Sequence, residues 1–182
     1  MNKRTALLVI DAQLCAFDSQ LEPACYKSEE LLEVLTSLIQ AARTADIPVI
    51  FIQHCGSKGQ LYEEGTEHWI IHPQLGPKPS ETVVHKRQSS AFDGTNLKNI
   101  LAELHIDSVI TCGLQSEFCV SNTSFTALDL GLNVTVAEDG HSTWSNDSDD
   151  AATIIQRQNM LLTDKGAKVM PLASLIERFA SS

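Results

Sequence analysis

Three side chains with complementary acid–base chemistry each follow a short apolar run of the sequence. Asp11 comes directly after Ala6–Ile10, Lys86 follows a later run, and Cys119 stands at the start of a helical pattern. A free cysteine titrates near pH ~8.5, and a helix N-terminus or a nearby cation lowers that pKa and increases the fraction of nucleophilic thiolate. A carboxylate within hydrogen-bonding distance can take the thiol proton, and an ammonium offsets the negative charge that gathers there. These residue types favour acyl transfer through a cysteine nucleophile.

The segment before Cys119 can supply the other requirement of such a reaction, which is stabilisation of an oxyanion. Backbone N–H groups in the turn that opens a helix have no partner within the helix. Donors aimed at the oxygen that gains charge when sulfur attacks a carbonyl contribute roughly 3–4 kcal/mol in comparable sites. The turn Gly113–Cys119 is therefore the expected place for an oxyanion hole.

The elements that position these side chains alternate between strand-like and helical patterns. Short β-branched and apolar runs predict buried strands at Ala6–Ile10, Pro48–Gln53, Thr82–His85, Ser108–Thr111, Asn133–Ala137 and Lys168–Met170. Apolar residues at helical spacing predict helices at Ser28–Ala45, Asn96–Leu104, Phe118–Leu130, Asp149–Leu162 and Leu172–Phe179. This alternation predicts a Rossmann-like α/β fold, a three-layer αβα arrangement with a doubly wound, mostly parallel sheet of about six strands.

In such a sheet, ligands bind beyond the carboxyl ends of the strands, where the winding reverses. A strand order of 3-2-1-4-5 makes the first and fourth strands neighbours at that point, so we expect Asp11 and Cys119 to face each other. Lys86 starts two strands away and must reach them with its long side chain and the adjoining loop. The stretch Gly56–Lys78 is too long for a plain connection and is expected to be a functional or oligomer-contact loop.

Length and composition restrict the class of protein. The 182 residues fit one domain, taken as 1–182, and 43% hydrophobic with 20% charged residues is typical of a globular chain. The net charge of −10 repels phosphate backbones and anionic lipid surfaces, so neither nucleic acid nor membrane is an expected partner. Five cysteines without a CxxC pair, and a first apolar run too short for a signal peptide, favour reduced thiols and a cytoplasmic location.

Four segments resemble the isochorismatase-like cysteine hydrolase family, and the resemblance covers nearly the whole chain. The most specific segment is the turn before and around the cysteine. The four are Leu7–Gln13, Lys86 with Ser90–Phe92, Gly113–Val120 and Val136–Ser142.

This resemblance implies a catalytic triad, with Asp11 as the base, Lys86 as the electrostatic partner and Cys119 as the nucleophile. It also implies a cis peptide bond between Leu114 and Gln115. The role of that bond would be to aim the N–H of Gln115, together with the N–H of Cys119, at the oxyanion.

The resemblance carries expectations about ligands and partners as well. Nicotinamidases of this family bind a metal through an Asp-x-His pair after the second strand, and this chain has Gln53-His54-Cys55 there, so we expect neither metal nor cofactor. The expected partner is a small-molecule substrate. Family members commonly form dimers or tetramers, so we expect a homo-oligomer in which the long loop closes its own or a neighbour's active site. The side chains expected to contact substrate are Gln13, Phe17, Glu117, Phe118 and Trp144.

Three functions stay open at this point. The leading hypothesis is hydrolysis of a small amide through a thioester on Cys119. The second is hydrolysis of an isochorismate-type vinyl ether, which needs no thiol. The third is a non-catalytic assembly protein with a vestigial site, against which the intact set of Asp11, Lys86 and Cys119 argues. The substrate is left open, because Leu14-Cys15-Ala16 departs from the family pattern before Phe17.

Two segments contain residues that could bind a metal, but for each a role without metal is favoured. His54, His68 and His72 could form a zinc site, but histidines in loops are commonly polar surface residues, and this second explanation is favoured. The stretch Asn146–Asp150 looks like a calcium loop, but it lacks the glycine and terminal glutamate of such loops, so capping of the next helix is favoured. The other thiols are expected to be small buried hydrophobes; these are Cys15, Cys25, Cys55 and Cys112.

Overall fold

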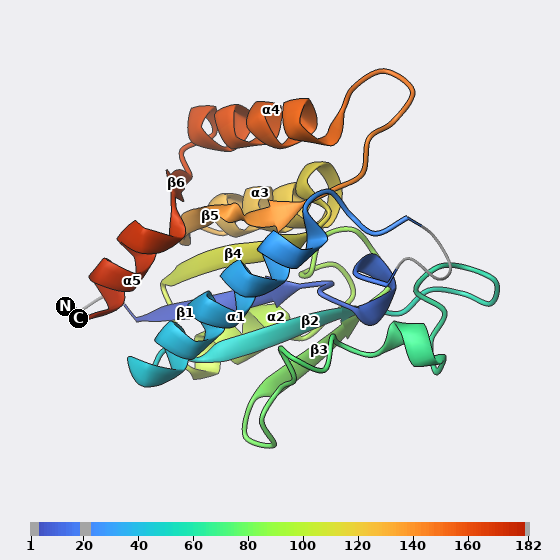
Figure 1. Ribbon diagram of the computed structural model, residues 1–182. Helices are drawn as coiled ribbons and strands as arrows, with labels where there is room; N and C mark the ends of the chain where they lie inside the picture. Colours follow the sequence, from blue (N-terminus) through green and yellow to red (C-terminus); the bar gives the residue numbers. More distant parts are fainter. Residues whose placement is uncertain (1–3, 19–22, 181–182) are drawn as a thin grey trace.

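The computed structural model describes residues 4–18 and 23–180, and its strands form a six-stranded, all-parallel sheet. The strands lie in the order β3-β2-β1-β4-β5-β6 (Figure 1). They are β1 (Thr5–Ile10), β2 (Val49–His54), β3 (Thr82–Lys86), β4 (Ser108–Leu114), β5 (Asn133–Ser142) and β6 (Lys168–Met170). The winding reverses between β1 and β4, as the sequence predicted.

Helices cover both faces of the sheet because the strands are apolar on both sides. Leu7 and Val9 of β1 point into one core layer, and Leu8 and Ile10 point into the other. The first layer is covered by α1 (Ser28–Thr44) and α5 (Leu172–Ala180), and the second by α2 (Leu97–Glu103), α3 (Ser121–Asp129) and α4 (Ala151–Asp164). Figure 1 shows α1 crossing the near face of the sheet. The predicted three-layer αβα arrangement is confirmed.

The acidic stretch before α4 forms a turn and a helix cap. Asp150 Oδ1 accepts a hydrogen bond of 2.7 Å from the N–H of Thr153, and this bond lowers the pKa of Asp150. Asn146 Oδ1 accepts hydrogen bonds from the backbone N–H groups of Ser148 and Asp149. The predicted capping role is confirmed, because these contacts satisfy the first N–H groups of the helix and its turn.

β4 and β5 extend by several residues beyond their predicted ends, and the helix after β4 starts differently. β4 continues to Leu114, and β5 continues to Ser142 through the exposed residues Glu138 and Asp139. The β4–β5 register shifts between Thr111 and Gly113, so acidic residues that look like a loop in the sequence belong to an irregular strand. Instead of a helix from Phe118 onward, a π-helical turn over 116–120 leads into α3.

Gly113 allows β4 to lie against β1 at the carboxyl end of the sheet. Its φ is +112°, a conformation that favours glycine, and a Cβ at this position would lie 1.9 Å from the carbonyl oxygen of Ile10. Because Ile10 directly precedes Asp11, any side chain at position 113 displaces the end of the strand that carries the carboxylate.

We therefore expect Gly113→Ala to lower the free energy of unfolding by about 3 kcal/mol or more, from backbone strain and the clash together. Chemical denaturation measures this change. Gly131→Ala is the matched control, because Gly131 also has a positive φ of +82° but a Cβ added there would have no atom within 4 Å. Equal losses in the two variants would show that the contact with Ile10 is unimportant.

The long loop after β2 packs on the segment that follows β1 of the same chain. Leu14 N–H donates to the Ile70 carbonyl at 2.8 Å, and His72 N–H donates to the Ala12 carbonyl at 2.9 Å. The loop includes a short 3-10 helix, η2 (Glu67–Trp69), and lies at the carboxyl ends of the strands. Gly56–Lys78 thus contacts the segment of its own chain that follows Asp11. Among the described residues, no helix has the length and apolarity that crossing a bilayer requires.

Candidate active site

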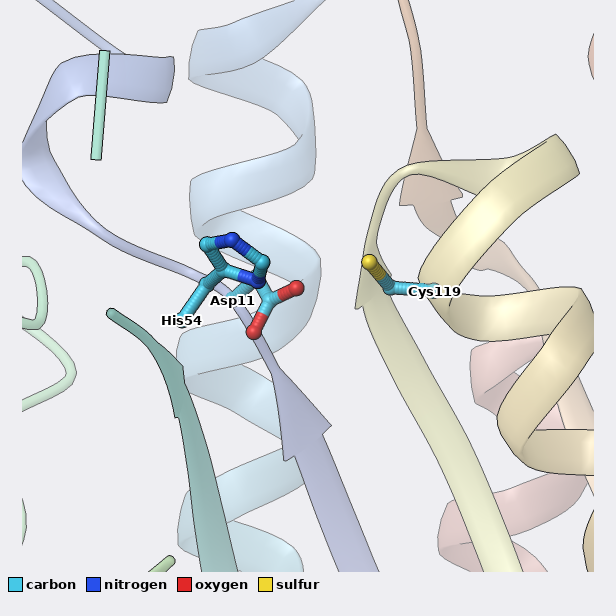
Figure 2. Close-up of side chains that lie close together, drawn as sticks. All are labelled: Asp11, His54 and Cys119. Carbon is cyan, nitrogen blue, oxygen red and sulfur yellow. The ribbon is translucent and has the colours of Figure 1, made fainter. Parts of the chain in front are cut away.

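Asp11, Lys86 and Cys119 meet at the carboxyl end of the sheet. Asp11 follows β1, Lys86 is the last residue of β3, and Cys119 lies in the π-helical turn after β4. Lys86 Nζ lies 2.7 Å from Asp11 Oδ2 and 3.1 Å from Cys119 Sγ. The lysine side chain therefore crosses the end of β2 and reaches both partners without help from the adjoining loop. Figure 2 shows the Asp11 carboxylate and the Cys119 sulfur facing each other.

The Lys86 ammonium is buried among acceptors. Besides Asp11 and Cys119, it lies 3.1 Å from His54 Nδ1 and donates to the Gln88 carbonyl at 3.1 Å. Burial by itself lowers the pKa of Lys86, but Asp11 and Cys119 outweigh this effect and raise the pKa above its usual range. The side chain is 1% exposed and stays charged.

Asp11 uses its two carboxylate oxygens differently. Oδ2 forms the ion pair with Lys86, whereas Oδ1 is buried and has no hydrogen-bond partner among the described atoms. The backbone is fixed, because Asp11 N–H donates to the Ile52 carbonyl at 2.9 Å. A buried carboxylate oxygen without a donor is costly, and its lone pairs are available to accept a proton.

The Cys119 thiol is protonated at rest, which corrects the expectation of a lowered pKa. Burial and the Asp11 charge raise the pKa of Cys119, and Lys86 opposes both without overcoming them, so that the pKa is raised to about 11. The ammonium therefore does not create a resting thiolate. The ammonium is paired instead with the adjacent Asp11 carboxylate, and the proton of Cys119 stays on sulfur.

A consequence can be measured by ultraviolet absorbance, which distinguishes a thiolate from a thiol. Because the pKa is raised, we expect Cys119 to stay protonated through neutral pH and to ionise only toward pH 11. The difference between the wild-type chain and Cys119→Ala isolates this thiol from the buried ones. Thiolate absorbance at neutral pH that disappears with Cys119 would contradict the burial argument.

Sequence reasoning missed two side chains of this site, His54 and Tyr62. His54 ends β2, and its ring contacts the Tyr62 ring with centroids 5.5 Å apart. Burial raises the pKa of Tyr62 well above its usual range, and the charge of Asp11 adds to this effect. The signal for His54 was present: it ends a buried run in the same way as Asp11 and Lys86. Tyr62 lies in the long loop, where periodicity gives no guide.

The donor atoms of Asp11, His54 and Cys119 lie within 4.8 Å of one another, close enough to be considered for a metal ion. The Lys86 ammonium lies in contact with all three, so a cation would first have to displace it. The zinc hypothesis that joined His54 to two loop histidines finds no such cluster in the described part of the chain. His72 instead packs edge-on against Phe17, with centroids 5.1 Å apart.

Gln13 holds backbone segments. Its Nε2 donates to the carbonyls of His54 and Trp69, at 3.1 and 2.6 Å, and its Oε1 accepts from His54 N–H at 2.8 Å. Both amide hydrogens thus have acceptors, and the side chain is fully buried. The Gln13 side chain therefore fixes His54 and the loop, and its predicted contact with substrate stays a prediction.

The other side chains predicted to contact substrate surround the site in different ways. Phe118, next to Cys119 in the chain, is 52% exposed. Glu117 Oε1 accepts from Thr143 Oγ1 at 2.9 Å, while its Oε2 is buried without a partner among the described atoms. Trp144 Nε1 donates to the Pro23 carbonyl at 2.6 Å, and Phe17 packs at the edge of the core. Phe118 and Glu117 are thus the better candidates.

The turn that carries Cys119 is held by a buried network. The Leu114–Gln115 peptide bond is cis, and the next residue, Ser116, lies 2.7 Å from His141 Nδ1 through its hydroxyl. His141 Nε2 lies 2.8 Å from Asn159 Oδ1 on α4. The His141 ring and the Asn159 side-chain amide together link the turn that carries Cys119 to β5 and α4, so the position of the sulfur depends on these two elements.

Comparisons with known proteins agree over most of the chain. The family model described as "Isochorismatase domain" matches residues 5–172. A streptothricin hydrolase from Streptomyces noursei is 36% identical over 139 residues, which cover 76% of this chain and 50% of that protein. The isochorismatase family protein YrdC of Bacillus subtilis is 30% identical over 187 residues, covering 98% of each chain. An isochorismatase structure from Pseudomonas putida KT2440 matches with a TM-score of 0.87 and 31% identity, over 94% of this chain and 89% of that one.

Proposed function

The chain belongs to the isochorismatase family, and from this premise we propose that it is a cysteine hydrolase that cleaves the C–N bond of a small amide through a thioester intermediate. One observation carries the proposal. The Asp11 carboxylate faces the Cys119 sulfur; one of its oxygens is buried without a donor among the described atoms, and the other is paired with a buried ammonium. This is a base, a nucleophile and a charge partner in mutual contact.

In the acylation half, Asp11 Oδ1 takes the thiol proton as Cys119 Sγ attacks the amide carbonyl carbon. The carbonyl π electrons move to oxygen, where the N–H groups of Gln115 and Cys119 would donate to the oxyanion. When the carbonyl reforms, the C–N bond breaks and Asp11 returns its proton to the leaving nitrogen. Ammonia or an amine leaves, and the acyl group stays on sulfur as a thioester.

In the deacylation half, water replaces the leaving group beside the carboxylate. Asp11 takes a proton from the water as its oxygen attacks the thioester carbonyl, and the C–S bond then breaks. The proton returns to Cys119 Sγ, and a carboxylic acid leaves. Lys86 stays protonated throughout, so its charge stabilises both the ionised Asp11 and the sulfur while it carries negative charge.

The similarity to streptothricin hydrolases supports hydrolysis as the reaction class. The chain spans about half the length of the two streptothricin hydrolases that it matches, 50% and 54%, so their named substrate is not a proposal for this chain. The amide class follows instead from the thiol mechanism, because a vinyl ether can be hydrolysed without a nucleophilic sulfur.

The proposal is tested by screening small primary amides and ureido compounds for ammonia release, with Cys119→Ala as the control. We expect at least one compound to be hydrolysed by the wild-type chain alone. Alkylation of Cys119 should stop that reaction. Amide hydrolysis that continues after complete alkylation would overturn the thioester mechanism, and an unreactive thiol would favour a non-catalytic protein.

A further inference from the structure

His54 contacts the charged centre through one ring nitrogen, while its backbone is fixed from two sides. Its Nδ1 lies 3.1 Å from Lys86 Nζ. Gln13 bonds to both its N–H and its carbonyl, and Trp69 Nε1 donates to the same carbonyl at 2.8 Å. The Tyr62 ring packs against the imidazole at an interplanar angle of 65°. The ring is thus held against the ammonium rather than left free to turn toward solvent.

The contact with Lys86 determines which nitrogen carries the proton. An ammonium only donates, so Nδ1 has to be the unprotonated acceptor, and the neutral ring then carries its hydrogen on Nε2. A proton on Nδ1 would point at a second donor 3.1 Å away. The hydrogen bond from Lys86 to His54 therefore exists only while the imidazole is neutral.

We propose that His54 is a positioning residue of the active centre: its neutral imidazole aims the Lys86 ammonium at Asp11 and Cys119, and protonation of the ring in acid breaks this alignment. The inference rests on the proposed function, because it concerns the same centre. It adds a pH-dependent element that the triad alone does not contain. His54 acts through Lys86 and need not touch the substrate.

The electrostatic surroundings favour the neutral ring. Burial lowers the pKa of His54, and the charges of Lys86 and Arg87 lower it further, while the charge of Asp11 acts in the opposite direction. The groups that face the imidazole come from each neighbouring element: Asp11 after β1, Lys86 and Arg87 at the end of β3, Cys119 in the π-helical turn and Tyr62 in the long loop. The ring is therefore neutral at pH 7 and gains its proton only below the usual imidazole range.

Two substitutions at position 54 distinguish the loss of the hydrogen-bond acceptor for Lys86 from the loss of a titrating side chain. The carbonyl oxygen of asparagine can stand near the position of Nδ1 and accept from Lys86, but it does not titrate. Leucine fills the space and offers no acceptor. His54→Asn and His54→Leu are compared with His105→Asn, an exposed histidine with φ of +55°, a conformation that asparagine tolerates.

The probe is p-nitrophenyl acetate, whose reaction with Cys119 is followed by p-nitrophenolate release, and the rate of Cys119→Ala is subtracted. We expect His54→Leu to slow acylation roughly ten- to a hundredfold, the loss typical of a hydrogen bond to a charged group. We expect His54→Asn to restore part of that loss and to keep its rate at lower pH than the wild-type chain. His105→Asn should follow the wild-type profile.

Two results would overturn the inference. One is a His54→Asn profile with the same acid limb as the wild-type chain. The other is a nitrogen NMR spectrum of the wild-type chain in which the His54 imidazole is charged, or protonated at Nδ1, at pH 7. This measurement needs neither a reaction nor a substituted chain that folds. A Cys119→Ala rate as fast as that of the wild-type chain overturns the proposed function instead, and the NMR result still decides the state of His54.

Discussion

Replacing Cys119 with alanine is expected to reduce turnover of an amide substrate roughly a thousandfold or more, because no other group can form the thioester. The same substitution removes the covalent adduct that a slowly hydrolysed substrate leaves on the protein. Mass spectrometry of the intact chain measures the adduct, and ammonia release measures turnover. The variant should stay folded, since the side chain lies in a turn and only a small buried volume is lost.

Cys25→Ala is the matched control, because Cys25 is also a buried free thiol but lies in the core beneath α1. We expect it to keep the adduct and the turnover at a modest loss of stability. Cys119→Ser should fall near the alanine variant, because a hydroxyl is a poorer nucleophile and a poorer leaving group than a thiol. Turnover that persists in both Cys119 variants would exclude the covalent route.

Lys86→Met is expected to reduce both stability and activity, because it leaves the Asp11 carboxylate buried without its cation. The two side chains are 0% and 4% exposed, and removing one partner of such a pair costs about 3–5 kcal/mol. Denaturant unfolding measures the loss. Methionine preserves most of the volume, so the change reports the charge rather than a cavity.

The pH dependence of this loss has a defined sign. The folded pKa of Lys86 is raised above the ~10.4 of an unfolded lysine, so the ion pair contributes stability below that pH and loses it as pH rises through the folded pKa. We expect the stability difference between the wild-type chain and Lys86→Met to be full at neutral pH and to shrink only in strong alkali.

The double variant Asp11→Asn/Lys86→Met provides the control for this pair. It removes both charges, so we expect it to regain much of the stability of the wild-type chain while remaining inactive. A Lys86→Met variant that is as stable as the wild-type chain would contradict the burial of a paired charge. A Lys86→Met variant that is destabilised but fully active would show that Lys86 has no role in the reaction.

The sheet and the meeting of Asp11, Lys86 and Cys119 were predictable because both follow from the alternation of apolar runs and helical patterns. Parallel strands must end at one edge, so reactive residues placed after them must gather there. The extension of β5 past Ala137 was not predictable, because Glu138 and Asp139 carry the polarity of a loop. They belong to the strand only because Val136 before them and His141 after them pair with β4.

The protonation state of Cys119 was predicted wrongly for a physical reason. A sequence reveals that a cation is available, but the pKa of a thiol depends on how far burial outweighs that cation, and burial is a property of the folded chain. The contacts of Lys86 with His54 Nδ1 and the Gln88 carbonyl are also properties of the folded chain. They depend on side-chain directions and backbone turns that no spacing rule contains.

The strand order also divides the centre between two consecutive parts of the chain. β1, β2 and β3 are adjacent and come first in the sequence, so Asp11, His54 and Lys86 belong to one half of the sheet. Cys119 follows β4 and belongs to the other half. The contact between Cys119 and Lys86 therefore depends on the pairing of the two halves through β1 and β4.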